Sequence, residues 1–421
     1  MFGTLLPSVK TAIPGPLSRK RVDVLAAHEC PAVTARRSRR AGHLGVENDD
    51  PIVWKSAAGA NVEDIDGNVY VDLTSGFGVA LVGHRHPAVV AAAVAQSSRL
   101  VHAMGDAWPD ETRIKLLEAL SEITPSGLDV AILGLSGADA VDAAVKTAVL
   151  ATGRTGVIAF DRGYHGLSLG TVGLQAYNAS FTDPFRAIVH PNITHLDWGC
   201  DLADLEAALD GSVGLVLAEP IQGRGGIREA PKGWLRQVAE AARTSGALIA
   251  LDEIQTGMGR TGSWFAGPDE GVIPDILCVG KALGGGFPIS ACLGTRAVMD
   301  AWGQSTGEAL HTQTFLGHPV GCAAALAVIE LLSAGLLGQI TPKGERLAAA
   351  LSPWQVRGRG LMRAVRIGVP SLPVSRALLR RGYLVLPADG DSLTLTPPVC
   401  LTDSQIDSFA AALSACVEEV R

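Results

Sequence analysis

The chain has 421 residues, of which 47% are hydrophobic and 18% are charged, and this composition excludes a disordered or low-complexity protein. The length is typical of about two or three domains. The formal net charge of −7 argues against general nucleic-acid binding, because that function requires a basic surface.

The segment before residue 50 departs from this acidic balance. Lys20 and Arg21 are followed by Arg36, Arg37, Arg39 and Arg40. A nucleic-acid-binding arm is one interpretation, but a solvated arm that packs on a neighbouring subunit agrees better with the rest of the chain. We therefore expect no nucleic-acid partner.

Cysteine and apolar patterns favour a cytoplasmic protein. The start, MFGTLLPSVKTAIPG, has no sustained apolar run, so no signal peptide is expected. None of the seven cysteines forms a C-x-x-C pair, which is typical of reduced thiols in a protein core. The most apolar stretch, residues 321–338, is interrupted by Glu330, which predicts a buried core or interface helix and no membrane span.

The first predicted element is a hairpin over residues 62–73, where apolar and polar residues alternate around a D-G-N turn. The loop 74–78, which contains Phe77, then leads to the sequence GHRHP. His84 and His86 could bind a metal, but no cluster of partner ligands is nearby. A polar turn ahead of a helix is favoured, and we expect no metal site.

Residues 109–153 predict a helix, a strand at 129–135 and a second helix. The first helix is indicated by the three-residue spacing of Ile114, Leu117, Leu120 and Ile123. The second helix begins with the sequence SGAD, in which Ser136 and Asp139 have the spacing of a capping box. The free N–H groups at such a helix start can bind an anion, although an ordinary capped helix shows the same pattern.

Alternating strands and helices continue to residue 293. Strands are predicted at residues 156–160, 214–218, 247–251, 276–279 and 288–293, with a helix at 234–242. This alternation predicts an α/β fold with a large, doubly wound, mostly parallel-sheet domain.

Beyond residue 338 the pattern changes to a smaller α+β domain. Strands are expected at 356–367, 382–386 and 392–395, and helices at 374–381 and 404–415. We therefore divide the chain into an N-terminal segment with the arm and part of the small domain (1–80), the large domain (81–325) and the C-terminal small domain (326–421).

The stretch 247–286 carries the most specific chemistry. Its first apolar run stops at Asp252, and the second stops one residue ahead of Lys281. Ligands of open α/β sheets bind outside the carboxyl ends of the strands, so we expect this carboxylate and amine on neighbouring strand ends. A lysine there can form a Schiff base with a carbonyl. A buried aspartate can pair with the ring nitrogen of pyridoxal phosphate and keep that ring protonated.

Several motifs in a fixed order extend this interpretation. They are LDEIQTGMGRTG followed by PDILCVGKALGGGFP, with LSGADAVDAAVKTA, GYHGLSLG, EPIQGRGG and HTQTFLGHPVGCAAALA in support. Over roughly residues 55–415 the chain resembles the class III aminotransferases, which include the 4-aminobutyrate, acetylornithine and ornithine enzymes. The resemblance implies fold type I, a pyridoxal phosphate cofactor and a homodimer with active sites at the subunit interface. It also implies ping-pong transfer between a small-molecule amino donor and a carbonyl acceptor.

The resemblance further implies roles around the cofactor ring. Lys281 would hold the cofactor as a Schiff base and then shuttle a proton. Asp252 would bond the pyridine nitrogen, and Gln255 would reach the ring hydroxyl. Tyr164 would stack on one face of the ring, and Ile254 would pack against the other.

Other roles concern the phosphate and the substrate. Gly137 and Ala138 would give backbone N–H groups to the phosphate, and Thr314 would reach it from the partner subunit. Glu219 would support the ring from a neighbouring strand end, and Phe77 would face the substrate.

Three positions depart from the family pattern, and all of them concern the substrate. Leu167 stands where the 4-aminobutyrate branch has a carboxylate-binding arginine. Arg224 replaces a common glutamate, and Thr394, ahead of Pro397-Pro398, replaces the arginine that pairs with that glutamate. Arg224 is expected either to face water or to bind a ligand carboxylate. Specificity for 4-aminobutyrate is not expected.

Two other functions remain as alternatives. Because the glutamate–arginine pair is missing, a pyridoxal-phosphate-dependent racemase, epimerase or aminomutase on the same scaffold is the main one. Residues 166–170 also match the G-x-S-x-G pattern of serine hydrolases, with Ser168 as nucleophile. No clear apolar strand precedes that motif, which argues against a hydrolase.

Overall fold

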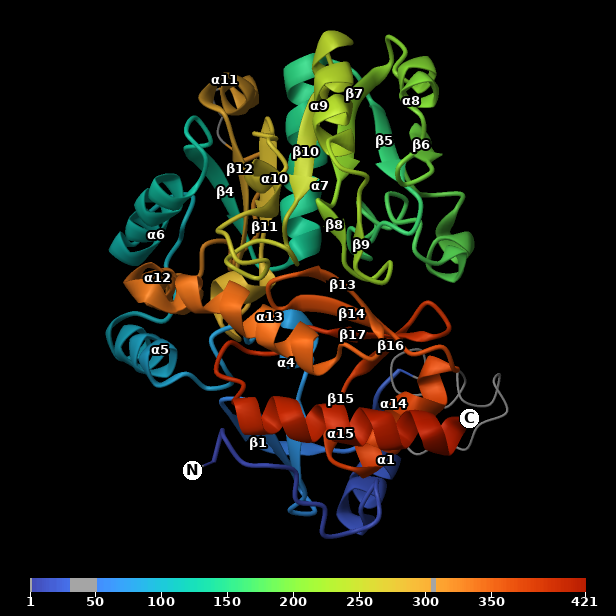
Figure 1. Ribbon diagram of the computed structural model, residues 1–421. Coiled ribbons are helices and arrows are strands. Elements are labelled where there is room, and N and C mark those ends of the chain that lie inside the picture. The colour runs from blue at the N-terminus through green and yellow to red at the C-terminus, as the bar shows by residue number, and fades with distance from the viewer. Residues whose placement is uncertain (1, 31–50, 304–307) are drawn as a thin grey trace.

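The structure, a computed structural model, describes residues 2–30, 51–303 and 308–421. The arginines at 36–40 of the predicted arm lie outside these residues. Figure 1 shows a large sheet flanked by helices in the upper half of the view and smaller sheets with α14 (Ser371–Arg380) and α15 (Asp403–Val420) in the lower half. The predicted α/β class is confirmed.

The large sheet has seven strands in the order β4-β12-β11-β10-β7-β5-β6. These are β4 (Val130–Gly134), β12 (Ser290–Gly294), β11 (Ile276–Val279), β10 (Leu248–Asp252), β7 (Val213–Ala218), β5 (Gly156–Phe160) and β6 (Ile193–Leu196). The five strands from β11 to β6 are parallel to one another, and β12 is antiparallel to both β11 and β4. The sheet is therefore mostly parallel, as the sequence predicts.

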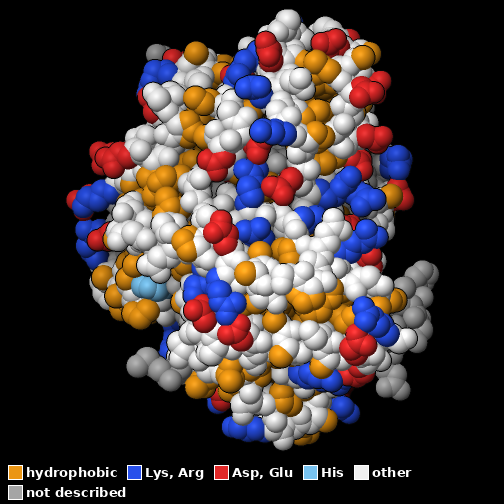
Figure 2. All heavy atoms as spheres, viewed as in Figure 1, with side chains coloured by type: hydrophobic (Ala, Val, Ile, Leu, Met, Phe, Trp, Pro, Cys, Tyr) orange, Lys and Arg blue, Asp and Glu red, His pale blue; other side chains and the backbone are white. Residues whose placement is uncertain are grey.

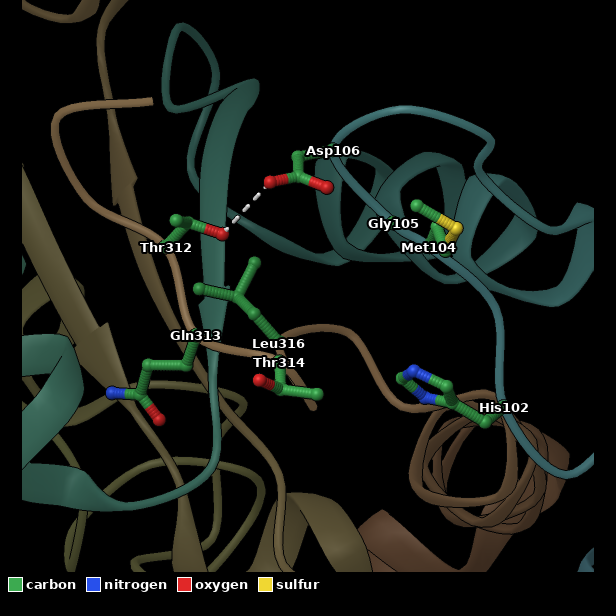
Figure 3. Close-up of a pocket in the computed structure, with 8 residues that line it drawn as sticks. All are labelled: His102, Met104, Gly105, Asp106, Thr312, Gln313, Thr314 and Leu316. Carbon is green, nitrogen blue, oxygen red and sulfur yellow. Dashed lines mark hydrogen bonds between the residues drawn. The ribbon is translucent and has the colours of Figure 1, made fainter. Parts of the chain in front are cut away.

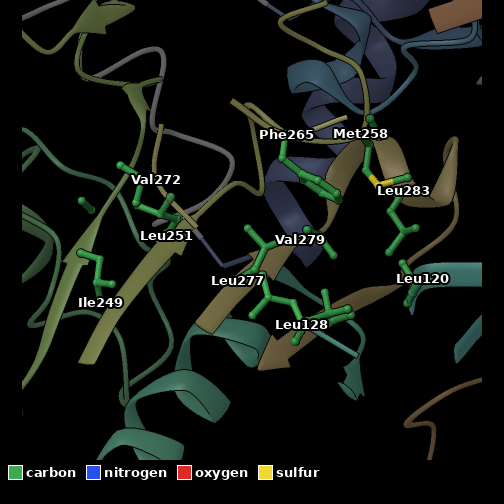
Figure 4. Packing of buried hydrophobic residues seen from close by; sticks show 14 of the residues in the cluster. Leu120, Leu128, Ile249, Leu251, Met258, Phe265, Val272, Leu277, Val279 and Leu283 are labelled. Carbon is green, nitrogen blue, oxygen red and sulfur yellow. The ribbon is translucent and has the colours of Figure 1, made fainter. Parts of the chain in front are cut away.

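Helices bury both faces of this sheet, which explains why its central strands are apolar throughout. The helices of this half are α5 (Pro87–Arg99), α6 (Glu111–Ile123), α7 (Gly137–Thr152), α8 (Leu202–Ala208), α9 (Trp234–Thr244), α10 (Ala266–Asp269), α11 (Arg296–Met299) and α12 (Pro319–Leu331). Ile249 and Leu251 share a core with residues of α9, whereas Ala250 packs with residues of α7. Figure 4 shows Leu277 and Val279 in the first of these cores.

The other half contains two four-stranded sheets. One is formed by β1 (Trp54–Ala58), β2 (Asn61–Asp64), β3 (Val69–Asp72) and β15 (Tyr383–Leu384), the other by β13 (Gln355–Arg359), β14 (Met362–Arg366), β17 (Ser392–Leu395) and β16 (Leu386–Ala388). Because β3 pairs in parallel with β15, segments from both ends of the chain share one sheet. The expected hairpin at 62–73 is confirmed as β2 and β3. The division into 1–80, 81–325 and 326–421 stays a prediction.

The apolar stretch near residue 330 lies within the fold. Among the described residues, Pro319–Ala350 is the helical stretch long and apolar enough to cross a membrane, and half of its most apolar window is buried. Its first helix, α12, packs against α5 and α6 and is buried along most of its length. This burial agrees with the predicted core helix.

Some predicted elements are corrected by the structure. The strand expected at 356–367 is a hairpin of β13 and β14, because the chain turns at Gly360 with φ +51°. The strand expected at 382–386 is interrupted between β15 and β16. The sequence prediction lacks β6, a sheet-edge strand without a fully buried residue, as well as α8 and α13 (Ile340–Ala350). The helix α1 (Pro16–His28) and the short helical turn α4 (Ser75–Gly78) are also absent from it.

The histidines and cysteines also occupy definite places. His84 lies 2.7 Å from Asp72 through Nε2 and Oδ2, and His86 precedes α5, so the polar turn is the better interpretation. Among the described residues, no group of three or more His, Cys, Asp and Glu side chains is arranged to hold a metal. Cys30 and Cys400 are exposed, which corrects the expectation that the thiols lie in the core. The buried cysteines are Cys278, Cys292, Cys322 and Cys416.

Candidate active site

Asp252 and Lys281 come together at the carboxyl edge of the large sheet. Asp252 is the last residue of β10 and lies opposite Cys278 of the neighbouring, parallel β11. Lys281 follows β11 after Gly280 and begins a 3₁₀ turn. Its Nζ donates a hydrogen bond to Oε1 of Gln255 over 3.2 Å. A carboxylate, an amide and an amine therefore share one edge of the sheet.

The surroundings of Lys281 favour its neutral form. Burial lowers the pKa of the amine, and the positive charges of Arg224 and Arg260 act in the same direction. The negative charges of Asp252 and Glu219 oppose the shift without cancelling it. The backbone of Lys281 is left-handed, with φ +43°, a strained conformation that is found mostly at functional sites. A lysine with a lowered pKa can act as nucleophile and base.

His165 holds the Asp252 carboxylate. Its Nδ1 lies 2.8 Å from Oδ2 of Asp252, and both side chains are buried. The other oxygen, Oδ1, accepts the backbone N–H of Ile254 at 3.1 Å. Burial alone would lower the pKa of His165, but the bond to Asp252 and the charges of Asp252 and Glu219 outweigh it and raise the pKa. His165 had no predicted role of its own, because its only signal in the sequence was its place next to Tyr164.

Glu219 connects the loops on the other side of Asp252. It follows β7, which pairs with β10. Its carboxylate accepts the backbone N–H groups of Tyr164 and Gly223, each at 2.9 Å. Burial raises the pKa of Glu219, and the charge of Asp252 adds to this rise while that of His165 opposes it. Through these two hydrogen bonds Glu219 holds the backbones of Tyr164 and Gly223 beside the strand ends.

The start of α7 is a capped helix N-terminus. Ser136 Oγ accepts the N–H of Asp139, and the Asp139 carboxylate accepts the N–H of Ser136, which confirms the predicted capping box. Gly137 has no space for a side chain, because an added Cβ would lie 2.8 Å from Cδ1 of Ile254. The N–H groups of Gly137 and Ala138 belong to the first turn, where helices bind phosphate.

Taken together, these groups fit pyridoxal phosphate. The helix start suits the phosphate, and the buried Asp252 suits a protonated ring nitrogen. Lys281 suits the aldehyde carbon, and Gln255 offers an amide to the ring hydroxyl. The missing space above Gly137 shows that the helix start packs directly against Ile254.

Arg224 and Phe77, the two expected substrate residues, lie near these groups. The guanidinium carbon of Arg224 is 4.4 Å from the centre of the Tyr164 ring. Phe77 is exposed and left-handed, with φ +65°, in the turn α4. That turn lies next to Lys281, because a Cβ added at Gly78 would be 3.9 Å from Cδ of the lysine.

Thr314 belongs to a separate pocket. Within the described residues it makes no hydrogen bond to Lys281, Asp252 or Gln255. Its exposed side chain lines a cavity of about 260 Å³ (Figure 3). The other lining residues are His102, Met104, Gly105, Asp106, Thr312, Gln313 and Leu316. A single chain therefore leaves Thr314 facing solvent.

Ser168, the serine of the G-x-S-x-G match, lacks the setting of a nucleophile. Its hydroxyl pairs with Thr171 at 3.0 Å, and no hydrogen bond joins it to a histidine among the described residues. The interpretation as a serine hydrolase is therefore not supported by the site.

Comparisons with known sequences agree with this geometry. Residues 45–417 match the family Aminotransferase class-III. The chain is 37% identical to the acetylornithine aminotransferase of Mycobacterium tuberculosis H37Rv, over 91% of this chain and 96% of that protein. It is 36% identical to the acetylornithine aminotransferase of Methanopyrus kandleri, over 88% of this chain and 96% of that protein.

Solved structures show the same architecture. The ornithine aminotransferase of Toxoplasma gondii ME49 superposes with a TM-score of 0.85 and 28% identity, covering 98% of this chain and 96% of that chain. The adenosylmethionine-8-amino-7-oxononanoate aminotransferase of Methanocaldococcus jannaschii superposes with a TM-score of 0.86 and 26% identity, covering 96% of this chain and 99% of that chain. These similarities confirm the predicted fold type I architecture.

Proposed function

The chain belongs to the class III aminotransferases and transfers amino groups with pyridoxal phosphate as cofactor, and we propose that Lys281, Asp252 and Gln255 hold and use that cofactor. One observation carries the proposal. The amine of Lys281 lies 3.2 Å from the amide of Gln255, at the end of the strand that neighbours Asp252. The reaction is a ping-pong exchange between an amino acid or amine and a keto acid or aldehyde.

Each neighbouring residue contributes to this task in a different way. Asp252, oriented by His165, keeps a proton on the ring nitrogen. Gly137 and Ala138 would hold the phosphate through backbone N–H groups, and Ile254 and Tyr164 would pack against the ring. Glu219 keeps Tyr164 in place through its backbone N–H.

Lys281 moves the proton of the reaction. When bound, pyridoxal phosphate supplies an electron sink for the pair released at the substrate carbon. Lys281, with its lowered pKa, would take the proton from the substrate carbon at its Nζ and give it back later in the transfer. The apolar side chain of Ile254 would help to keep water away from this transfer.

Replacing the lysine tests the proposal. Lys281→Ala should lose the visible absorbance of lysine-bound cofactor and roughly 10²–10⁴-fold or more in turnover, because the proton carrier is gone. Lys343→Ala removes a lysine that pairs with Asp403 far from the strand ends, and it should retain activity. Near-native turnover by Lys281→Ala would contradict the assignment.

A half-reaction separates the proposal from its main alternative. With an amino donor alone, the wild-type enzyme should lose its visible absorbance and release one keto product per active site. Racemisation or epimerisation would instead interconvert stereoisomers and leave that absorbance in place. The names of the relatives suggest acetylornithine and ornithine as the first donors for this measurement.

We also propose that the enzyme is a cytoplasmic homodimer. Large exposed apolar side chains belong to the two segments that line the Thr314 pocket: Met104 lines the pocket itself, and Phe315 packs against His102 of its lining. A second subunit would cover them, and Thr314 would then complete the phosphate site of the other subunit.

Mixing two defective variants tests this arrangement. Lys281→Ala and Thr314→Ala homodimers should each be impaired, but their hybrid holds one site in which both residues are native. A mixture refolded together should therefore regain about a quarter of the native activity, from half of the dimers and half of their sites. No gain over the unmixed variants would mean that Thr314 serves its own chain.

A further inference from the structure

Arg224 lies on a platform of aromatic rings. Its guanidinium carbon is 4.4 Å from the ring centre of Tyr164, 5.0 Å from that of Tyr177 and 6.0 Å from that of Phe181. Tyr164 and Tyr177 meet edge to face, with ring centres 6.3 Å apart. Cation–π contact holds a guanidinium through its flat face and leaves the N–H groups on its edge free to donate.

Two acids close to the segment that carries Arg224 already have other partners. Asp389 accepts from Arg162 at 3.3 Å and from Arg357 at 2.9 Å. Asp161 lies 3.7 Å from Arg228, the next arginine along this segment. Within the part of the chain that the structure describes, Arg224 forms no hydrogen bond or ion pair.

The charge of Arg224 acts on the active site. It is one of the groups that lower the pKa of Lys281, so its field reaches the reacting amine. The side chain is only half-buried, so the cation is partly desolvated without any acid to balance it. A partly desolvated cation with free donors gains most from a carboxylate, which the planar guanidinium can bind with two hydrogen bonds.

We infer that Arg224 binds a carboxylate of the substrate and so restricts the enzyme to amino acids and oxo acids in both half-reactions. The inference rests on the proposed aminotransferase function and adds the substrate class. Because Arg224 forms no direct ion pair with an acid of the described chain, donor and acceptor should each present an anion at this place. Substrates that would place a cationic group against Arg224, such as diamines, should be rejected.

Two variants test the inference through turnover. In Arg224→Gln, kcat/KM for a 2-oxo acid acceptor should fall roughly 10- to 100-fold, mainly through KM, while that for an uncharged aldehyde stays the same. Arg224→Lys should show a smaller loss, because lysine keeps the positive charge but lacks the paired N–H donors of a guanidinium. Arg162→Gln, which removes a neighbouring exposed arginine, is the matched control and should change neither acceptor. Equal losses for the acid and the aldehyde would overturn the inference.

A binding measurement keeps this test independent of the proposed reaction. Propionate cannot react, and titration calorimetry should show that it binds the wild-type holoenzyme at least 10-fold more tightly than Arg224→Gln. Propionamide should not distinguish the two proteins. Equal propionate binding would overturn the carboxylate site even in an active aminotransferase. An enzyme that binds propionate through Arg224 but converts no donor would instead contradict the proposed function alone.

Discussion

At the scale of single residues, neighbouring acids in the same motif have opposite environments. Asp252 faces the strand-end site with His165, whereas Glu253 points into the interior and is fully buried. Glu253 accepts the N–H groups of Ala266 at 2.8 Å and Gly267 at 2.7 Å. Burial outweighs these hydrogen bonds and raises the pKa of Glu253 to about 7.

This shift predicts a pH dependence of stability. The folded-state pKa of Glu253 lies above its unfolded value, so its contribution is fully present below the unfolded pKa and is lost as pH rises through about 7. The free energy of unfolding should therefore fall between about pH 5 and pH 8, by up to ~3 kcal/mol from this group. Glu253→Gln should remove that part of the slope in urea unfolding. An unchanged slope in the variant would mean that Glu253 is ionised throughout.

At the scale of elements, the start of α7 packs against the chain just beyond β10, and this contact is possible because Gly137 has no side chain. Gly137 in the first turn of α7 lies against Ile254, two residues beyond β10. The helix supplies N–H donors, and the loop after the strand supplies the apolar surface beside them. The proposed cofactor site therefore requires both elements.

Filling this contact should weaken the cofactor site. In Gly137→Ala the new Cβ meets Ile254 at 2.8 Å and displaces it. Overpacking of this kind typically costs about 1–3 kcal/mol, so pyridoxal phosphate affinity should drop roughly 10-fold in an absorbance titration of the apoenzyme. Gly338→Ala, where nothing lies within 4 Å of the added carbon, is the control. Adding Ile254→Ala should relieve the clash, and a double variant no better than the single would contradict this explanation.

At the scale of the whole molecule, Arg260 connects the two halves. It is fully buried after β10, yet its guanidinium donates to the carbonyls of Leu361 at 3.1 Å and Pro397 at 2.6 Å. A third bond reaches the carbonyl of Gly78 at 3.1 Å, next to Lys281. Burial lowers the pKa of Arg260 to about 9, although Asp72 opposes this shift.

Replacing Arg260 should lower the stability of the fold. Arg260→Met leaves three buried carbonyls without their donors, which should lower the free energy of unfolding by about 3–5 kcal/mol. Denaturant unfolding followed by tryptophan fluorescence measures this loss. Arg236→Met, at an exposed position of α9, should change stability by less than about 0.5 kcal/mol. A comparable effect of both changes would show that the buried hydrogen bonds do not stabilise the contact between the halves.

Local signals made most of the elements predictable from the sequence. The apolar runs of β10 and β11, the capping box of α7 and the hairpin of β2 and β3 depend on neighbouring residues, so their periodicity and turn chemistry are visible along the chain. The direction of β12 was not predictable, because a fully buried strand is apolar in either direction. The edge strand β6 lacks a buried stripe and left no clear pattern.

The sequence by itself was enough to predict Lys281 and Asp252 as the reactive pair that we propose, because each follows the end of an apolar strand. Only the tertiary structure decided what surrounds that pair. His165 is 87 residues from the aspartate it orients, and Arg260 is 182 residues from the carbonyl of Gly78. Contacts over such separations arise from how sheets and helices pack together, and the order of residues along a chain carries no direct record of them.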